Sequence, residues 1–154
     1  MPTEIERKFL IRSDGWRSAA YRSERMRQGY IANGQKASVR VRVAGARAVL
    51  NIKAAAAGAR RAEYEYVLSV ADAEEMLATL CPQLIEKTRY WAQYAGHVWE
   101  VDVFEGLNTG LIVAEIELAH VNEVFALPPW IGKEVTGERR YYNAALAERP
   151  FTRW

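Results

Sequence analysis

The feature that most constrains the fold of this chain is a period-two alternation of charged and apolar residues that recurs in segment after segment. Successive side chains of a β-strand point to opposite faces, so residues i and i+2 share a face. The alternation, interrupted by Gly, Asn and Ser, predicts eight strands. They are Thr3–Arg12, Arg25–Ala32, Ala37–Val43, Arg47–Lys53, Arg61–Leu68, Ile85–Tyr94, Val98–Phe104 and Leu111–Leu118.

Helical periodicity is confined to short stretches. The sequence predicts helices at Asp14–Ala20, at Ala71–Leu80 and at Glu138–Ala147, with a further short helix at Val121–Ala126. The second and third of these end just before a proline, which cannot continue a helix. Many strands and few helices are typical of an α+β barrel or sandwich.

The charges on these strands come as like-signed pairs two residues apart. Like charges about 6.5–7 Å apart on one face of a strand repel each other unless opposite charge lies nearby. The pairs are Glu4/Glu6, Arg40/Arg42, Glu63/Glu65, Lys87/Arg89, Glu100/Asp102 and Glu115/Glu117, and Lys8 and Lys53 share faces with their neighbours.

Two interpretations of the charged faces compete. An antiparallel sheet often exposes one charged face to water. However, nearly every strand contributes, and the opposite faces are rich in Val, Ile, Leu, Tyr and Phe, which must be covered. Helices packed outside a barrel would cover part of them, and the charged faces would then point into a shared interior.

Such an interior predicts its own ligands. Paired carboxylates suit hard divalent cations, Mg²⁺ or Mn²⁺, whereas one cysteine and two histidines make a zinc site a poor fit. Clustered Arg and Lys side chains match phosphate oxygens, and the sequence has no Gly-x-x-x-x-Gly-Lys-Ser/Thr loop. The set therefore predicts a metal and a polyphosphate held by side chains.

Size and composition set the remaining bounds. The chain has 154 residues, half of them hydrophobic, which predicts one domain over residues 1–154. A net charge of +2 argues against a nucleic-acid partner. No apolar run approaches the ~20 residues of a membrane span, and the first residues, with carboxylates where an apolar stretch would be needed, do not resemble a signal peptide. A lone Cys81 allows no internal disulfide, so we expect a cytoplasmic protein without a membrane partner.

The opening Glu4-Ile5-Glu6-Arg7-Lys8 resembles the Glu-x-Glu-x-Lys signature of the CYTH superfamily, the triphosphate tunnel metalloenzymes. The other charged pairs follow in the order expected for that family, and the run from Lys133 through Asn143 resembles its C-terminal segment. The resemblance implies an eight-stranded antiparallel β-barrel forming a tunnel, with helices packed outside and a C-terminal helix. The family often forms homodimers, so a second copy of the chain is also an expected partner.

The resemblance also implies roles. It makes Glu4, Glu6, Glu115 and Glu117 the principal metal ligands, supported by Glu63, Glu65 and Asp102. It assigns the triphosphate to Lys8, Arg40, Arg42, Lys53, Lys87 and Arg89. Four residues are expected to be catalytic: Lys8 neutralising charge as the bond breaks, Glu4 and Glu6 near the attacking water, and Tyr30 near the terminal phosphate.

Several activities are compatible with this family. Hydrolysis of inorganic tripolyphosphate to pyrophosphate and phosphate needs only the charged interior, and a short chain without an insertion that would build a base pocket favours it. Hydrolysis of thiamine triphosphate or of nucleoside triphosphates, cyclisation of ATP by a class IV-type adenylate cyclase, and a non-catalytic polyphosphate-binding module are the alternatives. The full set of glutamate pairs argues against the module.

Overall fold

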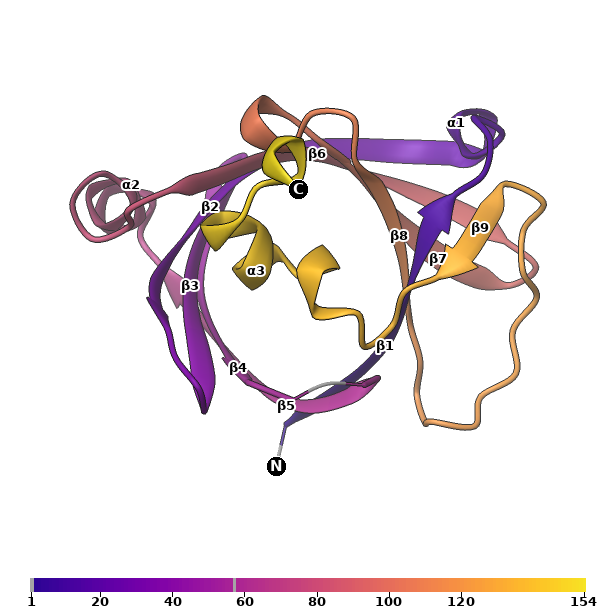
Figure 1. Cartoon of the computed structure of the whole chain (residues 1–154), viewed down its shortest axis with the longest axis horizontal. Helices are drawn as coiled ribbons and strands as arrows, with labels where there is room; N and C mark the ends of the chain where they lie inside the picture. The colour runs from indigo at the N-terminus through magenta and orange to yellow at the C-terminus, as the bar shows by residue number, and fades with distance from the viewer. Residues whose placement is uncertain (1, 57) are drawn as a thin grey trace.

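The computed structural model describes residues 2–56 and 58–154, and it contains a closed antiparallel β-barrel (Figure 1). Around the barrel the described strands run in the order β5-β4-β3-β2-β6-β7-β8-β1, and β1 pairs again with β5. The predicted eight-stranded antiparallel barrel is thereby confirmed. The strands are β1 (Thr3–Ile11), β2 (Ala20–Asn33), β3 (Ala37–Ala44), β4 (Arg47–Ala54), β5 (Arg60–Leu68), β6 (Leu84–Tyr94), β7 (His97–Phe104) and β8 (Ile112–Glu117).

The register of the strands brings charged residues opposite one another on the inner face. Residues directly opposite in an antiparallel pair share a face and lie close together. The cross-strand partners include Lys8 with Glu115, Glu4 with Arg61, Lys53 with Glu63, Arg89 with Asp102, and Glu100 with Glu115. The alternation that predicts the strands therefore also places their charges in one interior.

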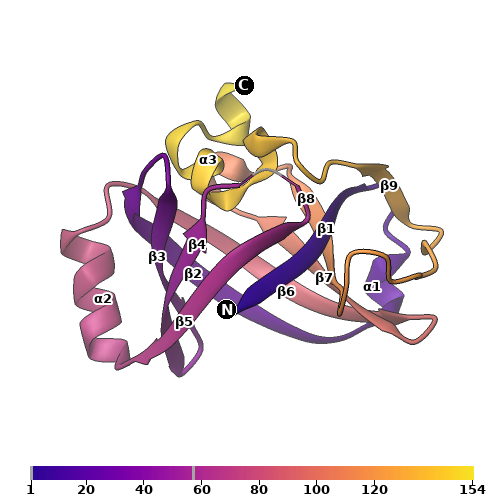
Figure 2. The same ribbon diagram turned by 90° about the horizontal axis from the view of Figure 1, so that it is seen from below.

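Apolar residues pack outside the barrel wall. Helix α2 (Val70–Thr79) begins where the Ser69 side chain accepts a hydrogen bond from the Asp72 N–H, and its buried Leu77 belongs to the cluster that covers β3 and β4. Helix α1 (Trp16–Ala19) buries Trp16 completely. Both helices lie outside the barrel, as predicted (Figures 1 and 2).

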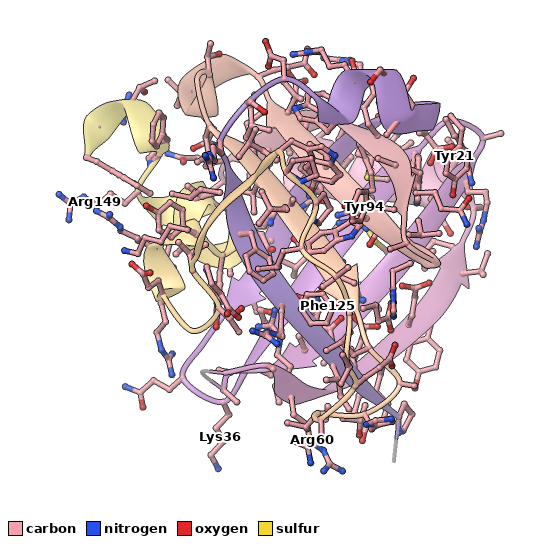
Figure 3. All side chains as sticks on the ribbon, turned by 90° about the vertical axis from the view of Figure 1, so that its right-hand side faces the viewer. Tyr21, Lys36, Arg60, Tyr94, Phe125 and Arg149 are labelled. Carbon is pink, nitrogen blue, oxygen red and sulfur yellow. The ribbon has the colours of Figure 1, made fainter. Side chains whose placement is uncertain are left out.

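The remaining outer face is covered by a loop. Residues 119–130 form turns and irregular backbone, not the helix predicted at Val121–Ala126. The Glu123 carboxylate accepts hydrogen bonds from the Ala119 N–H and pairs with His97, and such local bonds compete with a helix. Phe125 lies in the segment that crosses the outside of the barrel (Figure 3) and packs edge-on against Trp99.

Two strands differ from the prediction. The strand expected to begin at Arg25 begins at Ala20, and its first residues pair with β6. These residues are mostly exposed and polar, so they show no alternation of charged and apolar side chains. A further strand, β9 (Ile131–Glu134), pairs with β1 outside the closed barrel. Its four residues are too few for a periodic signal, and Gly132 allows the close approach, since a Cβ there would lie 3.1 Å from the Leu10 carbonyl oxygen.

The C-terminal segment lies across one end of the barrel (Figures 1 and 2). The predicted helix Glu138–Ala147 is wrong in extent: a 3₁₀ turn at Arg139–Tyr141 is followed by α3 (Asn143–Glu148) and a second 3₁₀ turn at Phe151–Arg153. Tyr141 and Leu146 are buried in the same cluster. One continuous helix would place them about 140° apart, and the extended backbone at Tyr142 turns both inward.

No helix among the described residues is long and apolar enough to span a membrane.

Candidate functional site

The barrel interior holds a polar cavity of ≈ 190 Å³. Tyr142, Asn143 and Ala144 form part of its wall, and they belong to the C-terminal segment that lies across one end of the barrel (Figure 2). The structure brings almost every predicted site residue to the cavity wall. These are Glu4, Glu6, Lys8, Tyr30, Arg40, Arg42, Lys53, Glu63, Glu65, Lys87, Arg89, Glu115 and Glu117. The predicted convergence of the charged faces on one interior is therefore observed, while the individual roles of these residues stay predictions.

The charges are segregated around the wall. Four adjacent strands, β4, β3, β2 and β6, form a basic arc, and the other four, β7, β8, β1 and β5, form an acidic arc. The basic arc carries Lys53, Arg40, Arg42, Lys87 and Arg89. The acidic arc carries Glu100, Glu115, Glu117, Glu4, Glu6, Glu63 and Glu65, with Lys8 and Arg61 as its two cations.

Cations bridge the carboxylates of the acidic arc. Lys53 Nζ lies 2.6 Å from Glu4 Oε1 and 3.4 Å from Glu63 Oε2. Arg61 Nε donates to Glu4 Oε1 at 3.1 Å, and Lys8 Nζ lies 3.5 Å from Glu115 Oε1. Among the described residues no three carboxylates come close enough to form a ready-made metal cluster.

These cations do not neutralise the whole arc. Burial, together with the nearby Glu115, raises the pKa of Glu6 to about 8. Burial and Glu4 also raise the pKa of Glu117. The pKa of Glu115, in contrast, is well below its ordinary value because Lys8 and Arg89 outweigh the effect of burial. A hard divalent cation binds ionised carboxylates, and a cation bound between these groups would offset the crowding that raises their pKa values.

The basic arc contains guanidinium groups without acid partners. Neither Arg40 nor Arg42 has a carboxylate oxygen within ion-pair distance in the described part of the chain. Arg40 is buried and its Nε lacks a hydrogen-bond partner, whereas Arg42 Nε donates to Gln28 Oε1 at 2.8 Å. Burial and the neighbouring Arg40 lower the pKa of Arg42 to about 9. Buried cations of this kind call for an anion.

Asp102 is the predicted site residue that does not reach the cavity wall. One of its oxygens accepts from Lys87 Nζ at 2.6 Å, and Arg89 donates to both oxygens at 2.7 and 2.9 Å. These cations lower the pKa of Asp102 despite its burial. The structure places Asp102 behind the wall, where it orients two basic side chains. Its predicted role as a metal ligand stays a prediction.

Six lining residues are absent from the predicted set: Ser38, Arg61, Glu100, Tyr142, Asn143 and Ala144. Strand parity predicts three of them, because Ser38 shares a face with Arg40, Arg61 shares one with Glu63, and Glu100 shares one with Asp102. The last three lie in the C-terminal segment, where no strand periodicity exists. Tyr142 packs its ring 5.0 Å from both Lys8 Nζ and Arg61 Cζ, which ties that segment to the acidic arc.

A closed barrel with an acidic and a basic arc around one buried cavity defines the class of charged-tunnel proteins. The CYTH domain family matches residues 2–147, and the chain belongs to that family. Membership implies a divalent metal cofactor, for which the acidic arc supplies suitable oxygen donors.

Similar proteins cover nearly the whole chain. An inorganic triphosphatase of Acetivibrio thermocellus is 47% identical over 98% of this chain and 97% of its own length, and one of Nitrosomonas europaea is 36% identical over 94% and 97%. A crystal structure of an inorganic triphosphatase superposes with a TM-score of 0.68 at 34% identity, covering 96% of this chain and 95% of that one. A Pyrococcus horikoshii protein shares the fold at 18% identity, with a TM-score of 0.62 over 77% and 80%.

Proposed function

We propose that this protein hydrolyses inorganic tripolyphosphate to pyrophosphate and phosphate inside the barrel, with Mg²⁺ or Mn²⁺ as cofactor. The observation that carries the proposal is the segregation of charge around one cavity, because a metal–polyphosphate complex has the complementary arrangement. Two relatives that match nearly the full length of this chain are named inorganic triphosphatase, which supports the same substrate class.

The basic arc binds the substrate in this proposal. Arg40 and Arg42 have no competing carboxylate among the described residues. Arg42 Nε is engaged by Gln28, and the remaining guanidinium N–H groups of the pair are available to donate to phosphate oxygens. Arg89 and Lys87 are fixed in position by Asp102. Pre-positioned donors lose little side-chain entropy when an anion binds, which favours tight and oriented binding.

The acidic arc holds the metal through Glu4, Glu6, Glu115 and Glu117, with Glu63 and Glu65 nearby. A bound divalent cation supplies an activated water and stabilises charge on phosphate oxygens. Lys53 bridges Glu4 and Glu63, and it would become available to a phosphate oxygen if a metal compensated those carboxylates in its place.

Lys8 is the residue best placed to neutralise charge that develops as the phosphoanhydride bond breaks. Lys8 is on the acidic arc, yet among the described residues its Nζ lies within ion-pair distance of a single carboxylate, Glu115, at 3.5 Å. The same Nζ donates to the Tyr141 carbonyl oxygen at 3.4 Å. Tyr30 lines the cavity from β2, opposite Arg40 in the strand register, where its hydroxyl is a candidate donor to the terminal phosphate. Tyr141 and Tyr142 of the C-terminal segment contact Lys8, and such contacts would limit the access of bulk water to it.

The direct test is phosphate release from tripolyphosphate, ATP and thiamine triphosphate, each with Mg²⁺, with Mn²⁺ or with a chelator. We expect metal-dependent release that is fastest with tripolyphosphate. Faster release from one of the organic triphosphates would make that compound the substrate. Cyclic AMP from ATP would indicate a cyclase, and tight binding without turnover would indicate a non-catalytic module.

A further inference from the structure

Asn143, the first residue of α3, connects the C-terminal segment to the basic arc. Its Oδ1 accepts a hydrogen bond from Lys87 Nζ at 2.9 Å and another from Gln28 Nε2 at 2.9 Å. Gln28 and Lys87 are fully buried in the barrel wall, and Asn143 lines the cavity. One amide oxygen thus receives two buried donors from two different strands, β2 and β6.

These hydrogen bonds fix which way the Asn143 amide points. The Arg42 guanidinium is a donor only, so the atom of Gln28 that Arg42 Nε contacts at 2.8 Å is the oxygen. The other amide atom of Gln28 is therefore the NH₂ group, and what it meets on Asn143 must be an acceptor, Oδ1. Amide orientation is set by such a network and not by the shape of the side chain.

The Asn143 NH₂ group consequently takes no part in this hydrogen-bond network. Among the described residues it donates no hydrogen bond to the protein, and it is not a fully buried atom. It belongs to a residue on the cavity wall, beside Lys87 and within the network that orients Arg42. Two neutral N–H donors are therefore held rigidly at the junction of the basic arc and the C-terminal segment.

We propose that Asn143 is a substrate-binding residue whose NH₂ group donates to a phosphate oxygen of the tripolyphosphate. This inference rests on the proposed function and assigns a further contact within the same site. The hydrogen bonds accepted by Oδ1 orient the amide in advance, so the contact adds no charge to an arc that is already strongly basic. It also makes closure of the barrel end by the C-terminal segment part of substrate recognition.

A purely structural role for Asn143 would be to attach α3 to the barrel. The chain offers a matched control for that role, because Asn33 Nδ2 donates to the Ala144 carbonyl oxygen at 2.8 Å. This bond also joins the barrel to α3, but it involves an exposed residue that does not line the cavity. Loss of attachment is thus separable from loss of the donor.

The experiment compares the wild-type chain with N143D, N143A and N33A. N143A removes the NH₂ donor without adding charge. N143D retains an oxygen for Lys87 and Gln28 but also places a negative charge beside the substrate, so only an unchanged affinity in N143D is diagnostic. Tripolyphosphate binding is measured by calorimetry in the presence of a chelator, and KM is measured with Mg²⁺. Thermal unfolding shows that each variant is folded. If N143A fails to fold, wild-type binding by the near-isosteric N143D would still overturn the inference.

A hydrogen bond to a charged group is worth roughly 1.5–3 kcal/mol, which corresponds to a loss of about tenfold to a hundredfold in affinity. We expect losses of this size in Kd and KM for N143D and N143A, and values within twofold of wild type for N33A. Wild-type binding by N143D, or an equal loss in N33A, would overturn the inference and leave the proposed function standing. A wild-type chain that neither binds nor hydrolyses tripolyphosphate would refute the proposed function itself.

Discussion

At the scale of single residues, Lys8 and Arg40 are two cations that line the same cavity but have different surroundings. Lys8 Nζ lies between a carboxylate and a backbone carbonyl on the acidic arc, 3.5 Å and 3.4 Å away, and faces the Tyr142 ring. Arg40 is similarly buried, but within residues 2–56 and 58–154 it has no acid partner and its Nε has no acceptor. We infer that Lys8 acts mainly in the transition state and Arg40 mainly in substrate binding.

Replacement of Lys8 by alanine therefore has a specific kinetic signature. We expect kcat to fall by about 10²–10³, the usual cost of losing one electrostatic group that acts in the transition state, while KM changes by less. Steady-state kinetics with tripolyphosphate and Mg²⁺ measure both. A rise in KM at constant kcat would contradict the role, because it would mean that Lys8 binds the ground state and the transition state equally.

Replacement of Arg40 by alanine has the opposite signature and an effect on stability. We expect KM to rise about tenfold or more, since a charge-assisted donor to phosphate is lost. Because its buried Nε is unsatisfied, we also expect the free energy of unfolding in the absence of substrate to stay unchanged or to rise by about 1 kcal/mol. Urea unfolding measures this, and a marked loss of stability would show that Arg40 is a structural residue.

Strand parity predicts most of the site at the residue scale, and its failures have physical causes. It places Glu4, Arg40 and their partners in one interior because β-strand geometry is strictly periodic. It does not distinguish Asp102, which has the parity of Glu100 but lies behind Lys87 and Arg89. Strand parity cannot predict the position of Asn143, because that position depends on how a non-periodic segment folds over the end of the barrel.

At the scale of elements, the short strand β9 shows how a segment outside the barrel is attached to it. Arg7, on the outer face of β1, donates from Nε and one terminal nitrogen to the two oxygens of Glu134 at 2.8 and 2.6 Å. Thr136 Oγ1 donates to the same carboxylate at 2.7 Å and accepts from the Lys8 N–H at 2.8 Å. These contacts fix the start of the C-terminal segment directly behind Lys8.

The Arg7–Glu134 pair predicts a pH dependence of stability. The hydrogen bond from Arg7, outweighing partial burial, lowers the pKa of Glu134 below its ordinary value of 4.5. A carboxyl group with a lowered pKa stabilises the fold above its unfolded pKa, and this contribution is lost as the pH falls through its folded pKa. The pair is about one-third exposed, so we expect a contribution of only about 0.5–1 kcal/mol.

The measurement is the melting temperature of wild type and E134Q between pH 3 and pH 7. The difference between the two proteins should be constant above pH 5 and should shrink as the pH falls below 4.5. E75Q, a change at an exposed position on α2, is the control and should show no such trend. A difference that is the same at pH 3 and pH 7 would show that the Glu134 carboxylate does not stabilise β9.

The elements with long periodic patterns are predicted well from the sequence, and the short ones are not. Helix α2 and most of the barrel strands appear within a few residues of their predicted bounds. β9, the broken C-terminal helix and the loop that carries Phe125 depend on tertiary contacts with β1, with the cluster around Tyr141 and with Trp99. Such contacts override local propensity in segments this short.

At the scale of the whole molecule, the barrel reverses the usual arrangement of a soluble domain. Its apolar residues pack between the outer wall and the covering helices and loop, while its interior is charged. Burying like charges costs free energy unless counter-charges compensate. In the proposed function, a metal on the acidic arc and a polyphosphate on the basic arc would supply these counter-charges, which would account for the separation of acidic and basic residues.

This arrangement predicts that a divalent cation stabilises the metal-free protein. Crowding on the acidic arc, seen in the raised pKa of Glu6 and Glu117, is relieved when a cation binds. A ligand present at one hundred times its Kd adds about 2.7 kcal/mol. We expect Mn²⁺ to raise the melting temperature in a concentration-dependent way and a chelator to reverse it. E115Q/E117Q should abolish the response, and a wild-type response in that variant would place the metal elsewhere.

The most direct test of the charge-segregated cavity is a crystal structure with tripolyphosphate and Mn²⁺, in which anomalous scattering locates the metal. We expect Mn²⁺ on the acidic arc beside Glu4, Glu6, Glu115 and Glu117, and phosphate oxygens in contact with Arg40, Arg42 and Arg89 on the basic arc. Mn²⁺ and tripolyphosphate bound only on the outer surface of the barrel, with the interior charges still paired among themselves, would contradict the account.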